Sequence, residues 1–255
     1  MIPVLSQEVQ LLFWKEVRQL TRNTAAMLTS LFMPAVLVVL APVLAILASR
    51  SQPYRSLQVP DLARSLPGFD VIHDGQGYFL FITLPFLFVL AALLTPVLSA
   101  THTLILERER RSLELLMALP VLVGDILTAK LAAVLVLAVA TVVPMYLVSA
   151  VVIAAVTDLA GQVAGYLLGA LFLLLATLVA SVGASLLLAL LARNLRSATS
   201  MGALLTVPPM VLTGVCVTFV PGLGRFVVLG LLMLAMGCGA LYAGLRWLTS
   251  ERYVA

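Results

Sequence analysis

The stretch "ERERRSLELLMALP", residues 107–120, places five consecutive charged residues near the middle of a mostly apolar chain. Of the 255 residues, 62% are hydrophobic and only 10% are charged, and long apolar runs flank the stretch on both sides. Soluble domains carry about 25% charged residues because polar side chains must cover their surface. The composition therefore predicts a polytopic membrane protein in which this cluster lies in water or against a partner protein.

The distribution of charge indicates topology. The 15 Lys and Arg exceed the 11 Asp and Glu, but they form short clusters between apolar segments and not a stripe that binds nucleic acid. No cleavable signal peptide is predicted, because the first long apolar run begins near Ala25 and is long enough to span. Cys216 and Cys238 stand inside apolar runs and are predicted to be small buried side chains.

A bilayer core about 30 Å thick needs roughly 20 apolar residues per crossing helix. Six segments meet this requirement, at residues 25–48, 78–106, 126–156, 163–191, 198–220 and 226–248. Eleven of the 15 Lys and Arg fall on the side of the N-terminus and four on the other, so both termini are predicted to be cytoplasmic. The expected fold is one all-α transmembrane domain over residues 1–255.

Residues 1–24 are predicted to hold an amphipathic interfacial helix. The apolar residues recur at steps of three and four, and the cations share another face that points toward lipid phosphates. The apolar set is Val9, Leu12, Phe13, Val17 and Leu20, and the cations are Lys15, Arg18 and Arg22. The alternative is a simple extension of the first span.

The long polar connection, residues 49–77, is predicted to be extracytoplasmic, with a short surface helix around residues 57–66. His73 beside Asp74 is expected to be solvated there. Two glycine series predict close helix packing, either within the chain or between subunits. They are Gly161, Gly165 and Gly169, spaced by four, and Gly230, Gly237 and Gly244, spaced by seven.

The fifth span is irregular. Pro208 and Pro209 fall near mid-membrane, and Pro221 and Gly222 stand at the outer end. Consecutive prolines remove helical hydrogen bonds, and non-helical backbone at that depth must be buried or line a cavity. We therefore expect a broken or re-entrant segment, with a helix that is merely kinked at the prolines as the alternative.

Several kinds of chemistry lack their residues. The chain has no GxxxxGK[ST] loop to hold nucleotide phosphates, and its two histidines, His73 and His102, stand apart without a catalytic or metal-binding set. Ion-coupled carriers hold ionisable groups within the bilayer, whereas the acidic residues here fall in loops or at boundaries. No catalytic, cofactor-binding or metal-binding residue is predicted, and the energy for any transport is expected from another chain.

Residues 107–120 are predicted to form a short cytoplasmic helix that docks on a protein. From Glu107 to Glu114 three acids balance three arginines, whereas a helix made for anionic lipid would be net basic. Ser112 can cap the helix, Pro120 ends it, and Asp125 is expected to cap the third span. The alternative is a solvated loop.

The sequences "ERERRSLELLMALPV" and "GDILTAKL" together resemble the cytoplasmic signature of type-2 ABC exporter permeases. The amphipathic helix, six spans, irregular fifth span and charged tail "SERYVA" fit the same plan. Two departures are Arg111-Ser112 in place of the usual Gly-Thr, and Ala129 in place of the Gly before Lys130.

The resemblance implies a permease subunit in the cell membrane that pairs with a second permease copy or a similar subunit and with two ABC ATPase subunits. ATP and magnesium would be bound by the ATPases and not by this chain. The docking or coupling helix would contact the ATPase through Glu107, Glu109, Arg110, Arg111, Glu114 and Leu115, with Asp125 nearby. Substrate would pass along the permease dimer interface, lined by the first, second and fifth spans, with Pro208, Pro209, Pro221 and Gly222 at the path or gate.

Two other functions stay open from the sequence. One is the haem-exporter permease of cytochrome c maturation, against which the long outer loop argues. The other is a membrane-embedded enzyme or scaffold without an ATPase.

Overall fold

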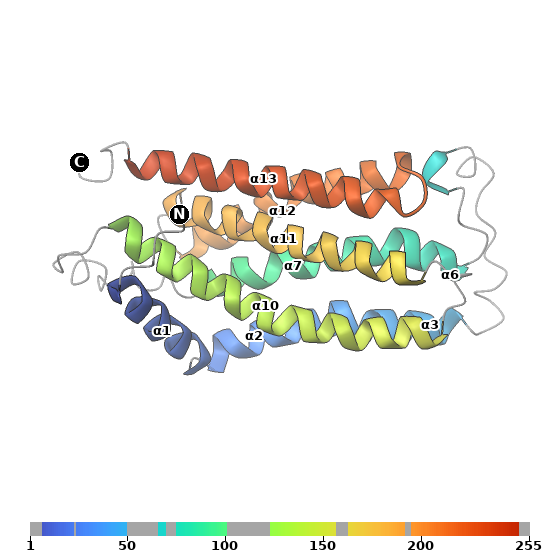
Figure 1. Ribbon diagram of the computed structural model, residues 1–255, viewed down its shortest axis with the longest axis horizontal. Coiled ribbons are helices and arrows are strands. Elements are labelled where there is room, and N and C mark those ends of the chain that lie inside the picture. Colours follow the sequence, from blue (N-terminus) through green and yellow to red (C-terminus); the bar gives the residue numbers. More distant parts are fainter. Residues whose placement is uncertain are drawn as a thin grey trace.

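The computed structural model describes residues 7–22, 24–49, 66–69, 75–100, 123–156, 163–191 and 195–249. Within these ranges the chain forms an elongated bundle of helices and contains no strand (Figure 1). The helices are α1 (Gln7–Arg22), α2 (Thr24–Pro34), α3 (Ala41–Ser49), α6 (Gly75–Tyr78), α7 (Leu84–Ala100), α10 (Val123–Val156), α11 (Val163–Leu191), α12 (Leu195–Phe219) and α13 (Gly224–Thr249). The predicted all-α membrane fold is confirmed at this level.

Five described helical stretches are long and apolar enough to cross a membrane. They are Phe79–Val97, Thr128–Ala155, Val163–Leu188, Ser200–Phe219 and Gly224–Gly244, which match the second to sixth predicted spans. The first predicted span is helical throughout residues 24–49, but its apolar stretch, Leu31–Ala45, is shorter. A sixth crossing therefore stays a prediction.

The first two predicted spans share a local feature just before a proline. The π-helical turns η1 (Ala35–Leu40) and η3 (Phe79–Thr83) are followed by Ala41 and Leu84, whose N–H groups donate five residues back, to Val36 O and Phe79 O. The next residue in each case is a proline, which has no N–H to donate. The π-turns allow both helices to continue past their prolines.

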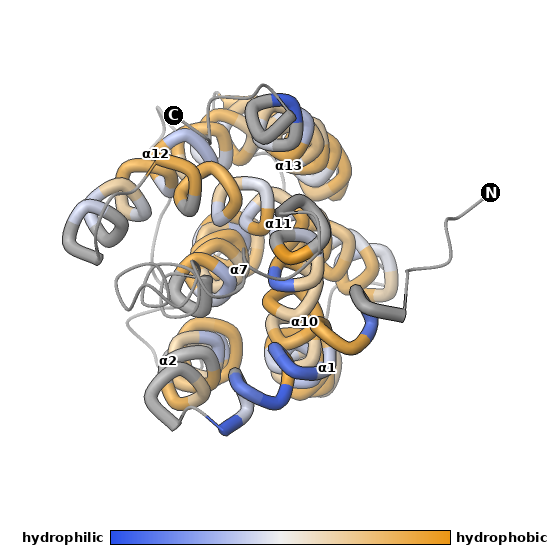
Figure 2. Tube along the Cα trace, turned by 90° about the vertical axis from the view of Figure 1, so that its left-hand side faces the viewer, coloured by the Kyte–Doolittle hydropathy of each residue, from blue (hydrophilic) through white to orange (hydrophobic). Residues whose placement is uncertain are grey.

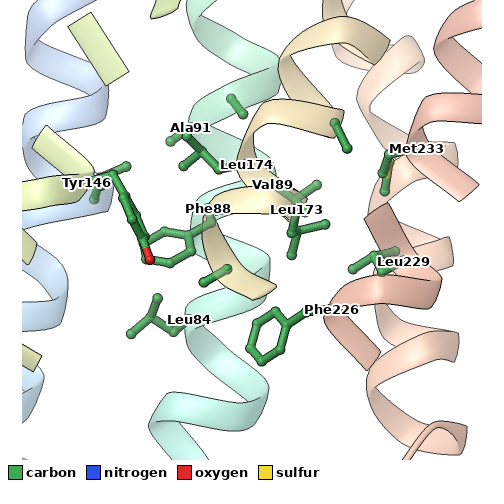
Figure 3. Close-up of a cluster of buried hydrophobic side chains, with 14 of the residues drawn as sticks. Leu84, Phe88, Val89, Ala91, Tyr146, Leu173, Leu174, Phe226, Leu229 and Met233 are labelled. Atoms are coloured by element: carbon green, nitrogen blue, oxygen red, sulfur yellow. The ribbon is translucent and has the colours of Figure 1, made fainter. Parts of the chain in front are cut away.

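The core lies where α7, α10, α11 and α13 meet (Figure 3). Phe88 of α7 packs edge-on against Tyr146 of α10, with ring centroids 5.5 Å apart, and Phe226 of α13 packs against Tyr166 of α11 at 5.1 Å. The helices α7 and α11 are central, whereas α2, α12 and α13 lie around them (Figure 2). The central pair thus forms the frame on which the other spans pack.

The glycine series pack α11 against α13 within the chain. A Cβ atom added at Gly237 would lie 2.7 Å from Ala180 Cα, and one at Gly183 would lie 2.7 Å from Gly237 O. Likewise, a Cβ at Gly169 would lie 3.1 Å from Phe226 Cβ. Of the two alternatives, the described packing of these glycines is intramolecular; Gly161 is outside the described residues.

The prediction of a broken fifth span is wrong. Helix α12 is continuous from Leu195 to Phe219 and passes through Pro208 and Pro209. Each proline removes one backbone donor, but membrane helices tolerate this loss because neighbouring turns and side-chain hydroxyls adjust. The chain instead reverses just beyond α12, at residues 220–223, where Gly222 adopts a φ of +56° that a residue without a side chain adopts readily.

Two smaller predictions are also tested. Cys216 is buried as expected, but Cys238 is exposed, because it lies on the face of α13 that points away from the core. Of the predicted outer loop, the structure describes residues 66–69, with a 3₁₀ turn at Pro67–Phe69, and the start of α6. The expected surface helix falls almost entirely outside the described residues, as do His73 and Asp74.

Candidate functional site

The predicted docking helix lies outside the described residues, together with its contact residues Glu107, Glu109, Arg110, Arg111, Glu114 and Leu115. In the chain, the segment joins the end of α7 to the start of α10. Asp125 lies in the first turn of α10, which begins at Val123, two residues before the predicted cap.

Helix α1 packs along α10 near its start (Figure 1). Phe13 and Val17 of the predicted apolar stripe contact a buried cluster on α10 that consists of Ala133, Val134 and Leu137. The stripe is therefore covered at least in part by protein. The opposite face of α1 is exposed and combines Leu11, Trp14, Lys15, Arg18 and Arg22.

A buried ion pair fixes α1 on α10. Lys130 Nζ lies 2.7 Å from Glu16 Oε1, and the two side chains are only 2% and 4% exposed. This pair was not predicted, although the sequence contains a signal for it. Glu16 falls on the apolar stripe of α1, three residues after Phe13, and Lys130 falls within an apolar helix, so each charge needed a partner.

A hollow of about 930 Å³ lies beside α1. The described residues that line it all belong to α1: Trp14, Lys15, Val17, Arg18, Gln19, Thr21 and Arg22. The described part of its wall combines three cations with an aromatic ring and an aliphatic side chain.

The predicted path or gate residues fall into two separate places. Pro208 and Pro209 are in the middle of α12, the first exposed and the second buried, whereas Pro221 and Gly222 belong to the turn after α12. Twelve or more residues separate the two pairs, which is roughly 18 Å along a helix. The structure therefore does not bring the four residues together into one site.

The exposed face of α12 is apolar along most of its length. It consists of Leu204, Val207, Val211, Val215 and Phe219, which recur at steps of three and four. The segments α2, η1 and α3 expose a similar row, formed by Leu28, Phe32, Leu40, Leu44 and Leu47. Both α2 and α12 pack on α7, one on each side of it (Figure 2).

Arg225 forms the other buried polar centre, at the opposite end of the bundle from α1. Its side chain is enclosed, and its residue is 1% exposed. Nε donates to Gly222 O at 2.8 Å, Nη1 to Phe81 O at 2.9 Å and Nη2 to Gly68 O at 2.8 Å, and the guanidinium lies over the Phe81 ring, 5.3 Å from its centroid. The sequence places Arg225 among the four cations on the side away from the N-terminus, and its burial was not predicted.

Gly68 is the point at which the connection between α3 and α6 meets α12. A Cβ atom at this position would collide with Val217 O and lie 2.5 Å from Thr218 O, so only glycine fits. The Tyr166 hydroxyl donates at 2.8 Å to the carbonyl oxygen of Leu80, the residue before Phe81. Arg225 and Gly68 together hold the ends of three elements in contact: η2 (Pro67–Phe69), η3 and the turn between α12 and α13.

Long apolar helices with their charged residues gathered near the ends define a multi-pass membrane protein. The ABC-2 type transporter family matches residues 7–221, from the start of α1 to the turn after α12, and the chain belongs to this family. It is therefore a permease component of an ABC transporter. Neither the comparison with curated proteins nor that with solved structures found a match.

Proposed function

We propose that this chain is the permease subunit of an ATP-driven exporter in the cell membrane, with both termini in the cytoplasm. It pairs with a second permease copy and with two ABC ATPase subunits, which bind ATP and magnesium. Membership of the ABC-2 type transporter family is the observation that carries this proposal. The same observation favours it over a membrane-embedded enzyme or scaffold.

Docking takes place through residues 107–120 in this proposal. Their net charge is zero between Glu107 and Glu114, which suits a protein groove of mixed charge, where polar contacts fix the register. The position of the segment supports the same role, because it connects α7, a central helix, to α10, which carries α1. A displacement of the segment therefore reaches the centre and the edge of the bundle at once.

Substrate passes between the two permeases along a path lined by the first, second and fifth spans. Support for this arrangement comes from the exposed apolar rows on α2–α3 and on α12, which flank α7. ATP binding closes the ATPase pair, the docking helices follow, and the spans on either side of α7 separate toward the outside.

The docking step is tested by charge reversal. We expect E114K, or R110E combined with R111E, to abolish co-purification of the ATPase, because like charges then face each other in the groove. R246E is the matched control, since Arg246 is an exposed residue in the last turn of α13. A complex that survives both reversals, with an unchanged ATPase rate, would refute docking through this segment.

A further inference from the structure

The ion pair between Glu16 of α1 and Lys130 of α10 joins two residues that are 114 positions apart in the sequence. We propose that it is a positioning pair that makes α1 move together with the first turns of α10, so that the movement of the docking segment is delivered to α2. This inference rests on the proposed function, because it takes the ATPase to act on the segment that precedes α10.

The surroundings of the pair keep it closed. The Lys130 ammonium and the Glu16 carboxylate are almost fully buried, and the apolar side chains of Phe13 and Val17 pack beside them on α10. Opposite charges attract strongly where the effective dielectric constant is low, and separating them would take this partner from the buried Glu16 carboxylate. The α1–α10 contact is therefore expected to stay intact while other contacts in the bundle change.

The pair lies close to the expected input of movement. Lys130 is seven residues beyond Val123, the first residue of α10, which corresponds to about 10 Å along the helix axis. A helix is stiff over this length, so a displacement of its first turn reaches Lys130 undiminished. Glu16 receives it directly, through a contact of 2.7 Å.

In this proposal, α1 passes the movement on to α2. Helix α1 ends at Arg22 and α2 begins at Thr24, so the two are almost continuous in the chain. Helix α2 packs on both α7 and α10. It forms the first part of the first span, one of the three spans proposed to line the path. The ion pair thus gives the first span a connection to the ATPase in addition to its packing on α10.

The pair is tested in the permease–ATPase complex, with permease-dependent ATP hydrolysis in proteoliposomes as the measured rate. We expect E16Q and K130Q each to keep the ATPase bound but to lower this rate roughly fivefold or more, within the range of ordinary coupling energies. The swapped variant, E16K combined with K130E, restores most of the rate because it re-forms the pair. Q10A is the control on the same helix, since Gln10 is exposed on α1 and is not among the residues that line the hollow.

A reversible cross-link separates positioning from a general loss of stability. Val17 and Ala133 belong to the same packed cluster, so V17C and A133C are the pair tested for disulfide formation once Cys216 and Cys238 are replaced by alanine. Oxidation is expected to leave the rate unchanged when Glu16 is present and to restore it in the E16Q background. Reduction of the same sample reverses the restoration.

Three results would overturn the inference. They are an unaltered rate in E16Q, a swapped variant no better than the single variants, and a rate that collapses when α1 is locked to α10. The cross-linked variant that retains Glu16 still tests the inference if E16Q fails to fold. Failure of the unchanged permease to retain an ATPase would instead refute the docking proposal itself.

Discussion

Replacing Arg225 with methionine removes the donor of three hydrogen bonds while it keeps much of the side-chain volume. The three acceptors are the carbonyl oxygens of Gly68, Phe81 and Gly222, at 2.8 to 2.9 Å from the guanidinium nitrogens. Hydrogen bonds that involve a charged group contribute about 1.5–3 kcal/mol each, but burial of the cation offsets part of this sum. We expect a net loss of about 3–5 kcal/mol in the free energy of unfolding, below the roughly 4.5–9 kcal/mol of the three hydrogen bonds because burial of the cation offsets part of it.

Thermal stability in detergent is a suitable assay for this change. A chain of this size loses roughly 2–4 °C in melting temperature per kcal/mol, so R225M is expected to melt on the order of 10 °C lower. R225K keeps the charge, but its single ammonium reaches fewer of the three carbonyls at one time, and an intermediate loss is expected. Because unfolding of such proteins is often irreversible, all variants are heated at one rate and compared by the fraction that stays monodisperse.

R18M is the matched control for this series. Arg18 is exposed on α1, and the substitution is expected to change the free energy of unfolding by no more than about 0.5 kcal/mol. If R225M melts within about 2 °C of the unchanged protein, less than the shift for 1 kcal/mol, then Arg225 does not hold the outer end together.

G237A is expected to destabilise the protein by about 1–3 kcal/mol, because the added methyl group would meet the α11 backbone at Ala180. A methyl group added at Gly239 would have no atom within 4 Å, so G239A is expected to be neutral or slightly stabilising. Denaturation of the two variants side by side checks this, and equal midpoints would contradict the close packing of α11 on α13. P208A combined with P209A is expected to preserve or raise the melting temperature, since α12 is already helical there and alanine returns two backbone donors. A large fall in melting temperature would show that the prolines stabilise a conformation other than a continuous helix.

Much of the fold could be predicted because it follows from local pattern. Apolar runs of sufficient length correctly predicted the second to sixth spans. The seven-residue spacing of Gly230, Gly237 and Gly244 likewise predicted the tightly packed face of α13. The spacing did not show which helix packs on that face, since a glycine stripe has the same appearance at any interface. The partner, α11, became evident only in three dimensions.

The errors arose where distant contacts override a local signal. Arg225 follows a turn and has the appearance of a solvated flank charge, but carbonyl groups from residues 144 and 157 positions away in the chain enclose it. The double proline in α12 was given too much weight, because two missing donors do not end a helix of 25 residues. Glu16 and Lys130 each place a charge among apolar residues in the sequence, and their opposite signs are enough to suggest that they pair.

The length of α10 has a mechanical consequence. Its 34 residues measure about 51 Å, against a hydrocarbon core of about 30 Å, so a substantial part of the helix projects beyond the lipid tails. A rod of that length that tilts by about 10° around its middle moves each end sideways by about 4 Å. If docking takes place as proposed, a small rotation deep in the bilayer and a lateral step at the start of α10 are one motion, with the long helix as the lever arm between them.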